Sequence, residues 1–259
     1  TMMKQFIKFL VRKVPREYLI FFSFLFSKLI TPFYYGNKYE CPICGGKFRK
    51  FLPYGNQGED NRLCPKCLSL ERHRLLWLYL KNKTDFFTSY YKVLHIAPEQ
   101  TFYYRFKKMD NIEYITADLK SPLAKVKMDI TKMPFEDNSF DIIICNHVLE
   151  HIDNDEIALS EIYRVLNDKG WAILQVPIDK SRNVTFEDKS IIDPTLREKL
   201  FGQHDHVRIY GLDYSNRLKN AGFFVLVDDY INTIDKTIIA RYRLPYDESI
   251  YVVYKNNNT

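Results

Sequence analysis

The nearly uninterrupted apolar run FDIIICN, at Phe140–Asn146, constrains the fold of this 259-residue chain more than any other feature. A strand with one face in water alternates apolar and polar residues, whereas a continuous apolar run suits a central parallel strand covered on both faces. The helical pattern of Asp155–Leu166 follows it, and the apolar segment Trp171–Pro177 comes next. Strands that alternate with helices in this way indicate an α/β fold with a doubly wound, mostly parallel, Rossmann-like sheet.

The expected sheet has seven strands, which we predict at residues 92–96, 113–117, 126–130, 140–146, 171–177, 223–227 and 249–255. Gly170, in Asn167–Gly170, is expected to end the helix before the fifth strand, as a helix C-terminal glycine does. The long segment 178–211 lies between elements and is predicted to form a lid or a substrate wall. We therefore assign residues 91–259 to one domain with an insertion at 178–211.

Four of the five cysteines form two CxxC pairs, Cys41-Pro-Ile-Cys44 and Cys64-Pro-Lys-Cys67, which 19 residues separate. Two such pairs can place four thiolates tetrahedrally around one zinc ion, whereas either pair alone could be a redox dithiol. Four protein ligands leave no open coordination position, so the spacing predicts a closed structural site without a catalytic role. Residues 39–80 are accordingly predicted to be a zinc ribbon and the helix that follows it.

Residues 1–38 form an apolar, basic leader that contains YLIFFSFLF at Tyr18–Phe26. Lys13, Arg16 and Lys28 interrupt it, and no uncharged stretch approaches the roughly 18–20 residues of a membrane-spanning helix. Three interpretations stay open: a helix that packs on the body, a helix in the membrane plane that contacts lipid through residues 6–35, or a contact with a partner. The CxxC pairs indicate a reducing compartment, so we expect a cytoplasmic protein, peripheral to the inner face of the membrane if the leader binds lipid.

Three segments recur, in this order, in one enzyme family: MDITKMPFEDNSFDIIICNHVLEHI, EIYRVLNDKGWAILQVP and LKNAGFFV. From about Tyr91 to Lys255 the chain resembles the class I S-adenosylmethionine-dependent methyltransferases of the type 11 branch. The resemblance implies methyl transfer from S-adenosylmethionine. Ligands of doubly wound sheets bind beyond the carboxyl ends of the strands. The resemblance therefore implies a cofactor site formed by His95, Ala97, Glu99, Asp118, Asp129, Ile130 and Asn146. Within it, Asp118 would accept hydrogen bonds from ribose and Asp129 would lie near adenine.

The first strand departs from the family in the stretch VLHIAPEQTF, which contains no glycine. His95 stands where the family has an acidic residue, and Ala97 and Glu99 replace glycines. A dinucleotide needs glycines there so that its pyrophosphate can approach the backbone, but S-adenosylmethionine carries no phosphate. We expect Glu99 to pair with the ammonium of its methionine end. The alternative is an inactive site in a zinc-dependent scaffold, because a fold does not guarantee a function.

Two histidine-containing segments are candidates for catalysis. HVLEH (His147–His151) fits the H-x-x-E-H pattern of one metalloprotease class, but its place in the methyltransferase-like order favours His147 at the substrate mouth. In FGQHDHVRIYG, the resemblance places His206 and Arg208 at the active-site cleft. His206 is the first candidate for the base and His147 the second, and Arg208 could hold a carboxylate or phosphate. The alternative for the second segment is a structural hydrogen-bonded turn.

The acceptor is the least constrained part of the prediction. The apolar leader, the insertion and the 15% of aromatic residues favour O-methylation of a small molecule or sugar, for example a membrane-linked glycan. RNA is the alternative acceptor, because a four-cysteine ribbon also precedes some RNA methyltransferase domains, and a net charge of +6 permits an anionic partner. NHVL stands where enzymes acting on exocyclic amino groups have an N/D-P-P-Y/F signature. Its absence argues against an exocyclic amino group of RNA or DNA as the target.

Overall fold

The computed structural model describes residues 14, 16–55 and 58–255, and it divides into two compact units. The first unit comprises Thr1–Thr88, Glu99–Lys108 and Asp229–Glu248, and the second comprises Ser89–Pro98, Met109–Asp228 and Ser249–Thr259. Parts of the predicted leader and of the predicted C-terminal domain, residues 1–13, 15 and 256–259, lie outside the described residues.

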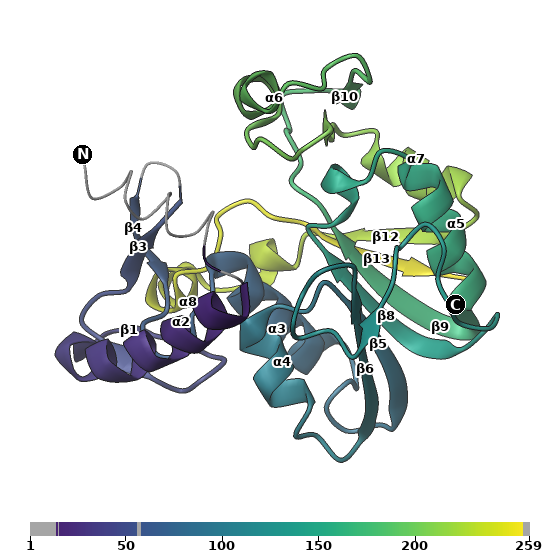
Figure 1. The fold of residues 1–259 in the computed structure, drawn as a ribbon. Coiled ribbons are helices and arrows are strands. Elements are labelled where there is room, and N and C mark those ends of the chain that lie inside the picture. Colours follow the sequence, from purple (N-terminus) through teal and green to yellow (C-terminus); the bar gives the residue numbers. More distant parts are fainter. Residues whose placement is uncertain (1–13, 15, 56–57, 256–259) are drawn as a thin grey trace. The chain divides into compact units, whose positions relative to one another are not determined.

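A seven-stranded sheet forms the centre of the second unit, with the strand order β12-β13-β9-β8-β5-β6-β7 (Figure 1). Its strands are β5 (Tyr91–Ile96), β6 (Ile112–Asp118), β7 (Val126–Lys127), β8 (Phe140–Asn146), β9 (Leu166–Gln175), β12 (Phe224–Asp228) and β13 (Ile250–Tyr254). All neighbours from β7 to β9 pair in parallel, and β13 is antiparallel to both β9 and β12. The predicted doubly wound, mostly parallel sheet is confirmed.

The strand order reverses between β5 and β8, which is where ligands bind in doubly wound sheets. From β5 the chain proceeds outward through β6 to β7 and then returns to β8 on the other side of β5. The loops after β5, β6 and β8 therefore meet at one edge of the sheet, which we call the carboxyl edge.

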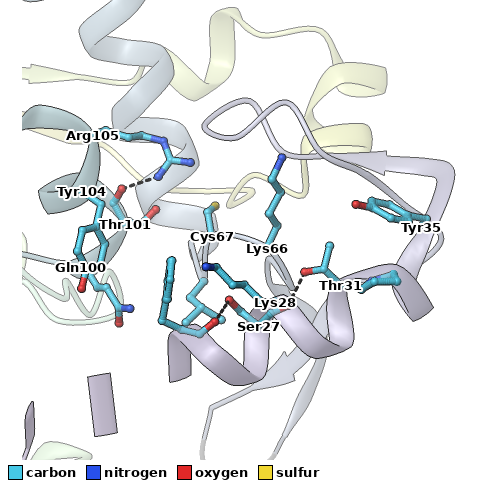
Figure 2. Close-up of a pocket in the computed structure, with 13 residues that line it drawn as sticks. Ser27, Lys28, Thr31, Tyr35, Lys66, Cys67, Gln100, Thr101, Tyr104 and Arg105 are labelled. Carbon is cyan, nitrogen blue, oxygen red and sulfur yellow. Dashed lines mark hydrogen bonds between the residues drawn. The ribbon is translucent and has the colours of Figure 1, made fainter. Parts of the chain in front are cut away.

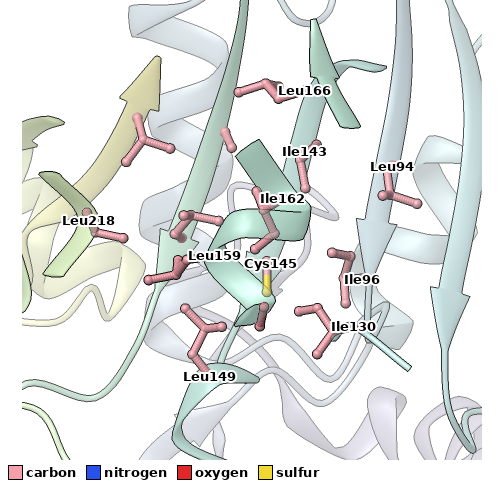
Figure 3. Close-up of a cluster of buried hydrophobic side chains, with 14 of the residues drawn as sticks. Leu94, Ile96, Ile130, Ile143, Cys145, Leu149, Leu159, Ile162, Leu166 and Leu218 are labelled. Atoms are coloured by element: carbon pink, nitrogen blue, oxygen red, sulfur yellow. The ribbon is translucent and has the colours of Figure 1, made fainter. Parts of the chain in front are cut away.

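Apolar side chains hold the helices α5 (Asp155–Val165) and α7 (Tyr214–Asn220) on one face of this sheet. Figure 3 shows Ile143 of β8 with Leu159 and Ile162 of α5 in the same buried cluster. Each such side chain contributes roughly 1.5–3 kcal/mol by leaving water. Asn154 caps α5 by accepting the N–H of Ile157. Ile142, Ile143 and Ile144 of β8 are all fully buried, so the strand is covered on both faces as its sequence predicts.

Gly170 has a different role from the predicted one. Helix α5 ends at Val165, and the chain passes directly into β9, in which Gly170 lies. A Cβ atom at this position would lie 2.8 Å from the carbonyl oxygen of Asp141 in β8. The prediction of a helix-ending glycine is wrong, because Gly170 allows two backbones to approach each other.

The insertion after β9 is folded. It contains β10 (Phe186–Glu187), which pairs antiparallel with β11 (Arg208–Ile209), and the helix α6 (Pro194–Phe201) between them. The short 3₁₀ helix η2 (Leu149–His151), which follows β8, is linked to this insertion because Val207 donates its N–H to the carbonyl of Glu150 at 2.9 Å.

The first unit contains short strands and several helices. They are α2 (Arg16–Ile30), η1 (Thr31–Tyr34), β1 (Tyr35–Glu40), β2 (Lys47–Phe48), β3 (Leu52–Tyr54), β4 (Glu59–Leu63), α3 (Glu71–Lys83), α4 (Gln100–Phe106), η3 (Tyr230–Thr233) and α8 (Lys236–Tyr242). Arg74 of α3 is fully buried and donates hydrogen bonds to four backbone carbonyls, those of Arg62, Ser69, Tyr242 and Arg243. No helix in the described part of the chain has the length and apolar character needed to cross a membrane.

Candidate functional site

The loop after β5 contains a left-handed residue that is not a glycine. Ala97 has a φ of +50°, in the left-handed region, and its N–H donates to the carbonyl of Ala117 at 2.9 Å. A side chain in this region costs roughly 1–2 kcal/mol, which is why glycine is usual there. The fold therefore holds Ala97 in a strained backbone conformation, and strain of this kind clusters at functional sites.

His95 lies inside the sheet. The residue is fully buried, and its Nδ1 lies 2.7 Å from the hydroxyl oxygen of Tyr114 on β6. The hydrogen bond joins β5 to β6 just before the two loops of the carboxyl edge begin. A role of His95 in cofactor binding would accordingly be indirect, through the position of these strands.

Two aspartates follow β6 and β7 at the carboxyl edge. Asp118 Oδ1 accepts the backbone N–H groups of Lys120, at 2.7 Å, and of Ser121. Asp129 Oδ1 accepts the N–H and hydroxyl groups of Thr131, at 2.8 and 2.7 Å, and these hydrogen bonds lower the pKa of the Asp129 carboxyl. Both side chains are held by their own loops, so they are available as fixed acceptors for hydroxyl or amino groups. The next residue, Ile130, is buried in the core cluster.

Glu99 belongs to the first unit, apart from the other predicted cofactor residues. Its Oε1 lies 3.9 Å from Nε2 of His73 on α3. The pairing of Glu99 with the methionine ammonium stays a prediction.

The fourth strand, β8, ends at Asn146, which is buried, and His147 follows it. His147 also has a left-handed backbone, with a φ of +54°, and donates its N–H to the carbonyl of Gln175 at 2.7 Å. Its Nδ1 lies 3.3 Å from Oε1 of Glu150, and its Nε2 has no hydrogen-bond partner among the described residues. The imidazole is thus oriented from one side by a buried carboxylate, and the other nitrogen is left for a ligand.

The backbone of HVLEH does not form the helix that a metalloprotease would need. His147 is left-handed and His151 ends a single turn of 3₁₀ helix, so the two side chains are not on one face of an α-helix. The metalloprotease alternative is not supported by this geometry.

His206, the first candidate for the base, lies against η2. Its ring centroid is 4.7 Å from that of His151, and its Nδ1 is 3.2 Å from the carbonyl oxygen of Phe201. Burial lowers the pKa of His206, and its Nε2 has no partner among the described residues. The sequence predicted His206 and His147 as alternative bases. In the structure Glu150 lies close to both of them.

Arg208 does not face an acceptor. Its side chain is 2% exposed, and it donates hydrogen bonds to the carbonyls of Leu149, Ile152 and Asp153. It also forms an ion pair with Glu187 at 2.9 Å. The expectation that Arg208 binds a substrate carboxylate or phosphate is corrected, because its donors are engaged within the protein. The guanidinium instead holds η2 against the insertion.

The four predicted metal cysteines lie together in the first unit, with their sulfur atoms no more than 4.8 Å apart. Cys41 Sγ lies 3.6 Å from Cys67 Sγ, and Cys44 Sγ lies 3.8 Å from Cys64 Sγ. Tetrahedral zinc with Zn–S bonds of about 2.3 Å separates its sulfurs by about 3.8 Å. The arrangement of the thiols fits a zinc ion.

The two cysteine pairs have matching backbone geometry. In the first pair, the N–H of Gly45 donates to the carbonyl of Cys41, and the N–H of Cys41 donates to the carbonyl of Gly46. In the second pair, the N–H of Leu68 donates to the carbonyl of Cys64, and the N–H of Cys64 donates to the carbonyl of Ser69. Gly45 and Leu68 are both left-handed, with φ of +65° and +58°. The Ser69 hydroxyl lies within 3.4 Å of the sulfurs of Cys41 and Cys67. These are the tight turns that the CxxC motifs predict.

A cavity of about 420 Å³ lies in the first unit beside the second cysteine pair (Figure 2). The rings of Phe24 and Tyr104 line it together with three cationic residues, Lys28, Lys66 and Arg105. Arg105 donates to the carbonyl of Thr101, whose buried hydroxyl has no partner among the described residues. No carboxylate of the described residues lines the cavity, so it suits an anionic amphiphile.

Glu150 is the main site residue that the sequence alone did not single out. Its side chain is only 3% exposed and lies between His147 on one side and the His151–His206 pair on the other. The available signal was the position of an acidic residue between two histidines in HVLEH, because a buried carboxylate almost always has a partner.

Comparison with known proteins gives a family for part of the chain. Residues 89–174 match the model of the family described as Methyltransferase domain, Methyltransf_11. The uncharacterized protein MJ0638 of Methanocaldococcus jannaschii is 29% identical over 197 residues, which cover 73% of this chain and 82% of that protein. The family match confirms the resemblance identified in the sequence.

Two solved structures illustrate the structural likeness. The cyclase SpnF has a TM-score of 0.51 and 14% identity, covering 82% of this chain and 89% of its own. The PH0226 protein of Pyrococcus horikoshii has a TM-score of 0.46 and 16% identity, covering 73% of this chain and 93% of its own. The likeness to SpnF supports the fold alone, so the acceptor has to be inferred from this chain's own residues.

Proposed function

We propose that this S-adenosylmethionine-dependent methyltransferase, whose methyltransferase domain includes residues 89–174, methylates a hydroxyl group on a small molecule or sugar. The favoured acceptor is a membrane-linked glycan. The observation that carries the O-methylation proposal is the pair of His147 and Glu150 at the end of β8.

A hydroxyl acceptor needs a base, and His147 has the features of one. S-adenosylmethionine, when bound, supplies a methyl group on an electrophilic sulfonium. As the acceptor oxygen bonds to the methyl carbon and the carbon–sulfur bond breaks, with S-adenosylhomocysteine as the leaving group, the hydroxyl proton would pass to Nε2 of His147. Glu150, 3.3 Å from Nδ1, orients the ring and stabilises the imidazolium that results. His206 is the alternative base. It lies in a cluster with Glu150 and His151, whereas His147 directly follows the end of β8.

The carboxyl edge supplies the groups that would hold the cofactor. Ala97 preserves the loop conformation after β5, and Asp118 and Asp129 present fixed carboxylates for the ribose and the adenine. Ile130 would contact the adenine and Asn146 the methionine end, and Glu99 would pair with the ammonium. His95 would act indirectly, by holding β5 and β6 in position.

The first unit supports a membrane-linked acceptor. Phe22, Phe26 and Leu29 of α2 are 55–64% exposed, and large apolar side chains on one helix favour a lipid surface. The cavity lined by Lys28 and Lys66 can take the phosphate of an anionic lipid carrier. Membrane attachment of this kind needs no spanning helix.

The four cysteines are proposed to bind a structural zinc ion. Their spacing and sulfur–sulfur distances match tetrahedral zinc, and all four positions would be occupied by protein. The ion would stabilise the first unit and take no part in methyl transfer.

Two measurements test the function. Calorimetry with S-adenosylmethionine should show one binding site, whereas no binding would favour the scaffold alternative. Transfer of labelled methyl groups should then be measured with lipid-linked glycans, free sugars and RNA as separate acceptors. We expect label in the lipid-linked glycan fraction, and alkaline stability of the product would identify an ether. Label in RNA, with none in glycans or sugars, would overturn the proposed acceptor.

A further inference from the structure

A second group of metal-ligating atoms lies in the second unit, separate from the cysteines. Glu150 and His151 come from η2, and His206 comes from the segment before β11, more than fifty residues later. One ligand atom from each residue lies within 4.8 Å of the others. We infer that Glu150, His151 and His206 form a binding site for a divalent transition-metal ion.

Both imidazoles are oriented as metal ligands are. Nδ1 of His206 lies 3.2 Å from the carbonyl oxygen of Phe201, and Nδ1 of His151 lies 3.2 Å from that of Asp205. A carbonyl can only accept, so each Nδ1 carries the proton and each Nε2 presents its lone pair. Metal-bound histidines are almost always fixed by such a hydrogen bond on the other ring nitrogen.

Two of the three ligating side chains carry a buried polar atom without a hydrogen-bond partner among the described residues. Oε2 of Glu150 and Nε2 of His206 are buried without a hydrogen bond among the described residues, and their residues are 2% and 6% exposed. Leaving a buried acceptor unsatisfied destabilises the folded state. Neither atom can donate a hydrogen bond to the other, whereas a cation held by the three residues would satisfy both.

The surrounding structure keeps the three ligands in place. Arg208 donates to the carbonyls of Leu149 and Ile152, on both sides of Glu150 and His151, and Val207 donates to the carbonyl of Glu150. Arg208 therefore holds the insertion against η2. Because His206 is only two residues from Arg208, it is held near Glu150 and His151 as well. His151 is the most exposed of the three ligands, with a side chain that is 32% exposed.

The donor set indicates the class of metal. Two imidazoles and one carboxylate suit zinc and neighbouring transition metals, whereas magnesium and calcium prefer oxygen ligands. Tetrahedral bonds of about 2.1 Å separate ligand atoms by about 3.4 Å. The widest pair here therefore has to close by at most about 1.4 Å, which side-chain rotation permits. Three protein ligands also leave a coordination position for water or another small ligand. The site does not depend on which acceptor the enzyme uses.

Cobalt provides the test, because its spectrum distinguishes ligands. The metal-free full-length chain is titrated with Co²⁺ while absorption is recorded. We expect one ion with intense thiolate-to-cobalt bands from the cysteines and a second ion with only weak ligand-field bands. Glu150→Gln and His206→Gln should weaken the second ion at least about tenfold and leave the thiolate bands unchanged. His204→Gln is the matched control, since His204 is an exposed neighbour of His206 outside the cluster.

A second measurement needs no variant. Bound Co²⁺ should shift the ring protons of His151 and His206 in the nuclear magnetic resonance spectrum of the wild-type chain. The inference is overturned if no thiolate-free cobalt binds, if both variants keep it, or if the shifted rings belong only to other histidines. Loss of the thiolate bands alone would contradict the zinc proposal and leave this site intact.

Discussion

The four-cysteine cluster of the first unit and the Glu150–His151–His206 cluster of the second are both dense groups of metal ligands, built in different ways. Each cysteine pair is a local turn, closed by hydrogen bonds within six residues. The second cluster depends on contact between η2 and a segment more than fifty residues away, which Arg208 secures. We call the cysteine cluster a local site, because its turns can form before the rest of the unit folds. We call the second cluster an assembled site, because its ligands come together only once the second unit has folded.

The largest expected effect is the loss of the proposed zinc ion of the first unit. Structural zinc contributes apparent binding free energies of about 10–16 kcal/mol in small domains, and these sites often do not fold without it. Cys64→Ser should abolish zinc binding and raise amide hydrogen exchange throughout residues 39–80, while the strands of the sheet stay protected. Mass spectrometry of exchanged peptides measures both regions in one sample.

Cys145→Ala is the control for this substitution, because Cys145 is the one cysteine of the described residues that lies in the sheet core. It should keep the zinc and the protection of residues 39–80. If Cys64→Ser instead exposes the sheet to the same extent as the cysteine turns, the two units share one cooperative core, and the contrast between a local and an assembled site fails.

The next effect concerns the network that holds the assembled site. Arg208 and Asp155 are both buried, 3.7 Å apart, and Tyr210 donates its hydroxyl to Asp155 at 2.7 Å. Removing one partner of a buried ion pair costs about 3–5 kcal/mol, because the remaining charge is left without compensation. Arg208→Gln should therefore lower the free energy of unfolding of the second unit by about this amount, as measured by urea denaturation.

Arg182→Gln is a suitable comparison, since Arg182 forms an exposed ion pair with Asp179 in the same insertion. It should leave stability nearly unchanged, because solvent screens such pairs. Arg208→Gln should also weaken the thiolate-free cobalt site, and Arg182→Gln should not. Equal effects of the two substitutions would mean that Arg208 does not brace η2.

These contrasts explain what the sequence could predict. The strands were found within a few residues, because β8 and its neighbours are apolar runs bounded by polar ends, a signal contained in the segment itself. The four cysteines were found for the same reason, through their spacing. Gly170 was misread because its close approach to Asp141 is a tertiary contact.

The errors at the candidate site have the same origin. Arg208 looked like a substrate ligand, but carbonyls from residues 149–153 take its donors, and no spacing rule connects these segments. Glu150 was passed over because its burial and its contact with His206 are tertiary features that the sequence of HVLEH does not contain. The left-handed backbone of Ala97 could not be predicted from the sequence, because the rest of the fold balances local strain of this kind.

A catalytic substitution sharpens the comparison further. His147→Gln should reduce turnover by about a hundredfold or more, because the base is lost, and leave the affinity for S-adenosylmethionine and the cobalt content unchanged. His206→Gln should lower the cobalt content and reduce turnover less than His147→Gln does, because His147 is the proposed base. Initial rates and calorimetry on the same preparations separate the two residues. Unchanged turnover in His147→Gln would remove it from the proposed mechanism.

The smallest effects are expected at two left-handed residues, one in the first cysteine turn and one in the loop after β5. Gly45 lies in the first cysteine turn with open space where a Cβ would be, so Gly45→Ala adds only backbone strain and should cost about 1–2 kcal/mol. Ala97→Gly is the opposite change at the carboxyl edge. It relieves similar strain but gives the unfolded chain more freedom, so the net gain should be at most about 1 kcal/mol.

Urea midpoints at unchanged denaturant slope measure both substitutions, because an altered slope would signal a change in the unfolded state. Ala158→Gly in α5 is the control for the alanine, and it should destabilise because φ there is already helical. If Ala97→Gly destabilises as much as Ala158→Gly, the methyl group of Ala97 makes contacts that outweigh the strain. The loop after β5 would then be specifically built around alanine, and the absence of glycine would be a property of this cofactor site rather than a tolerated departure.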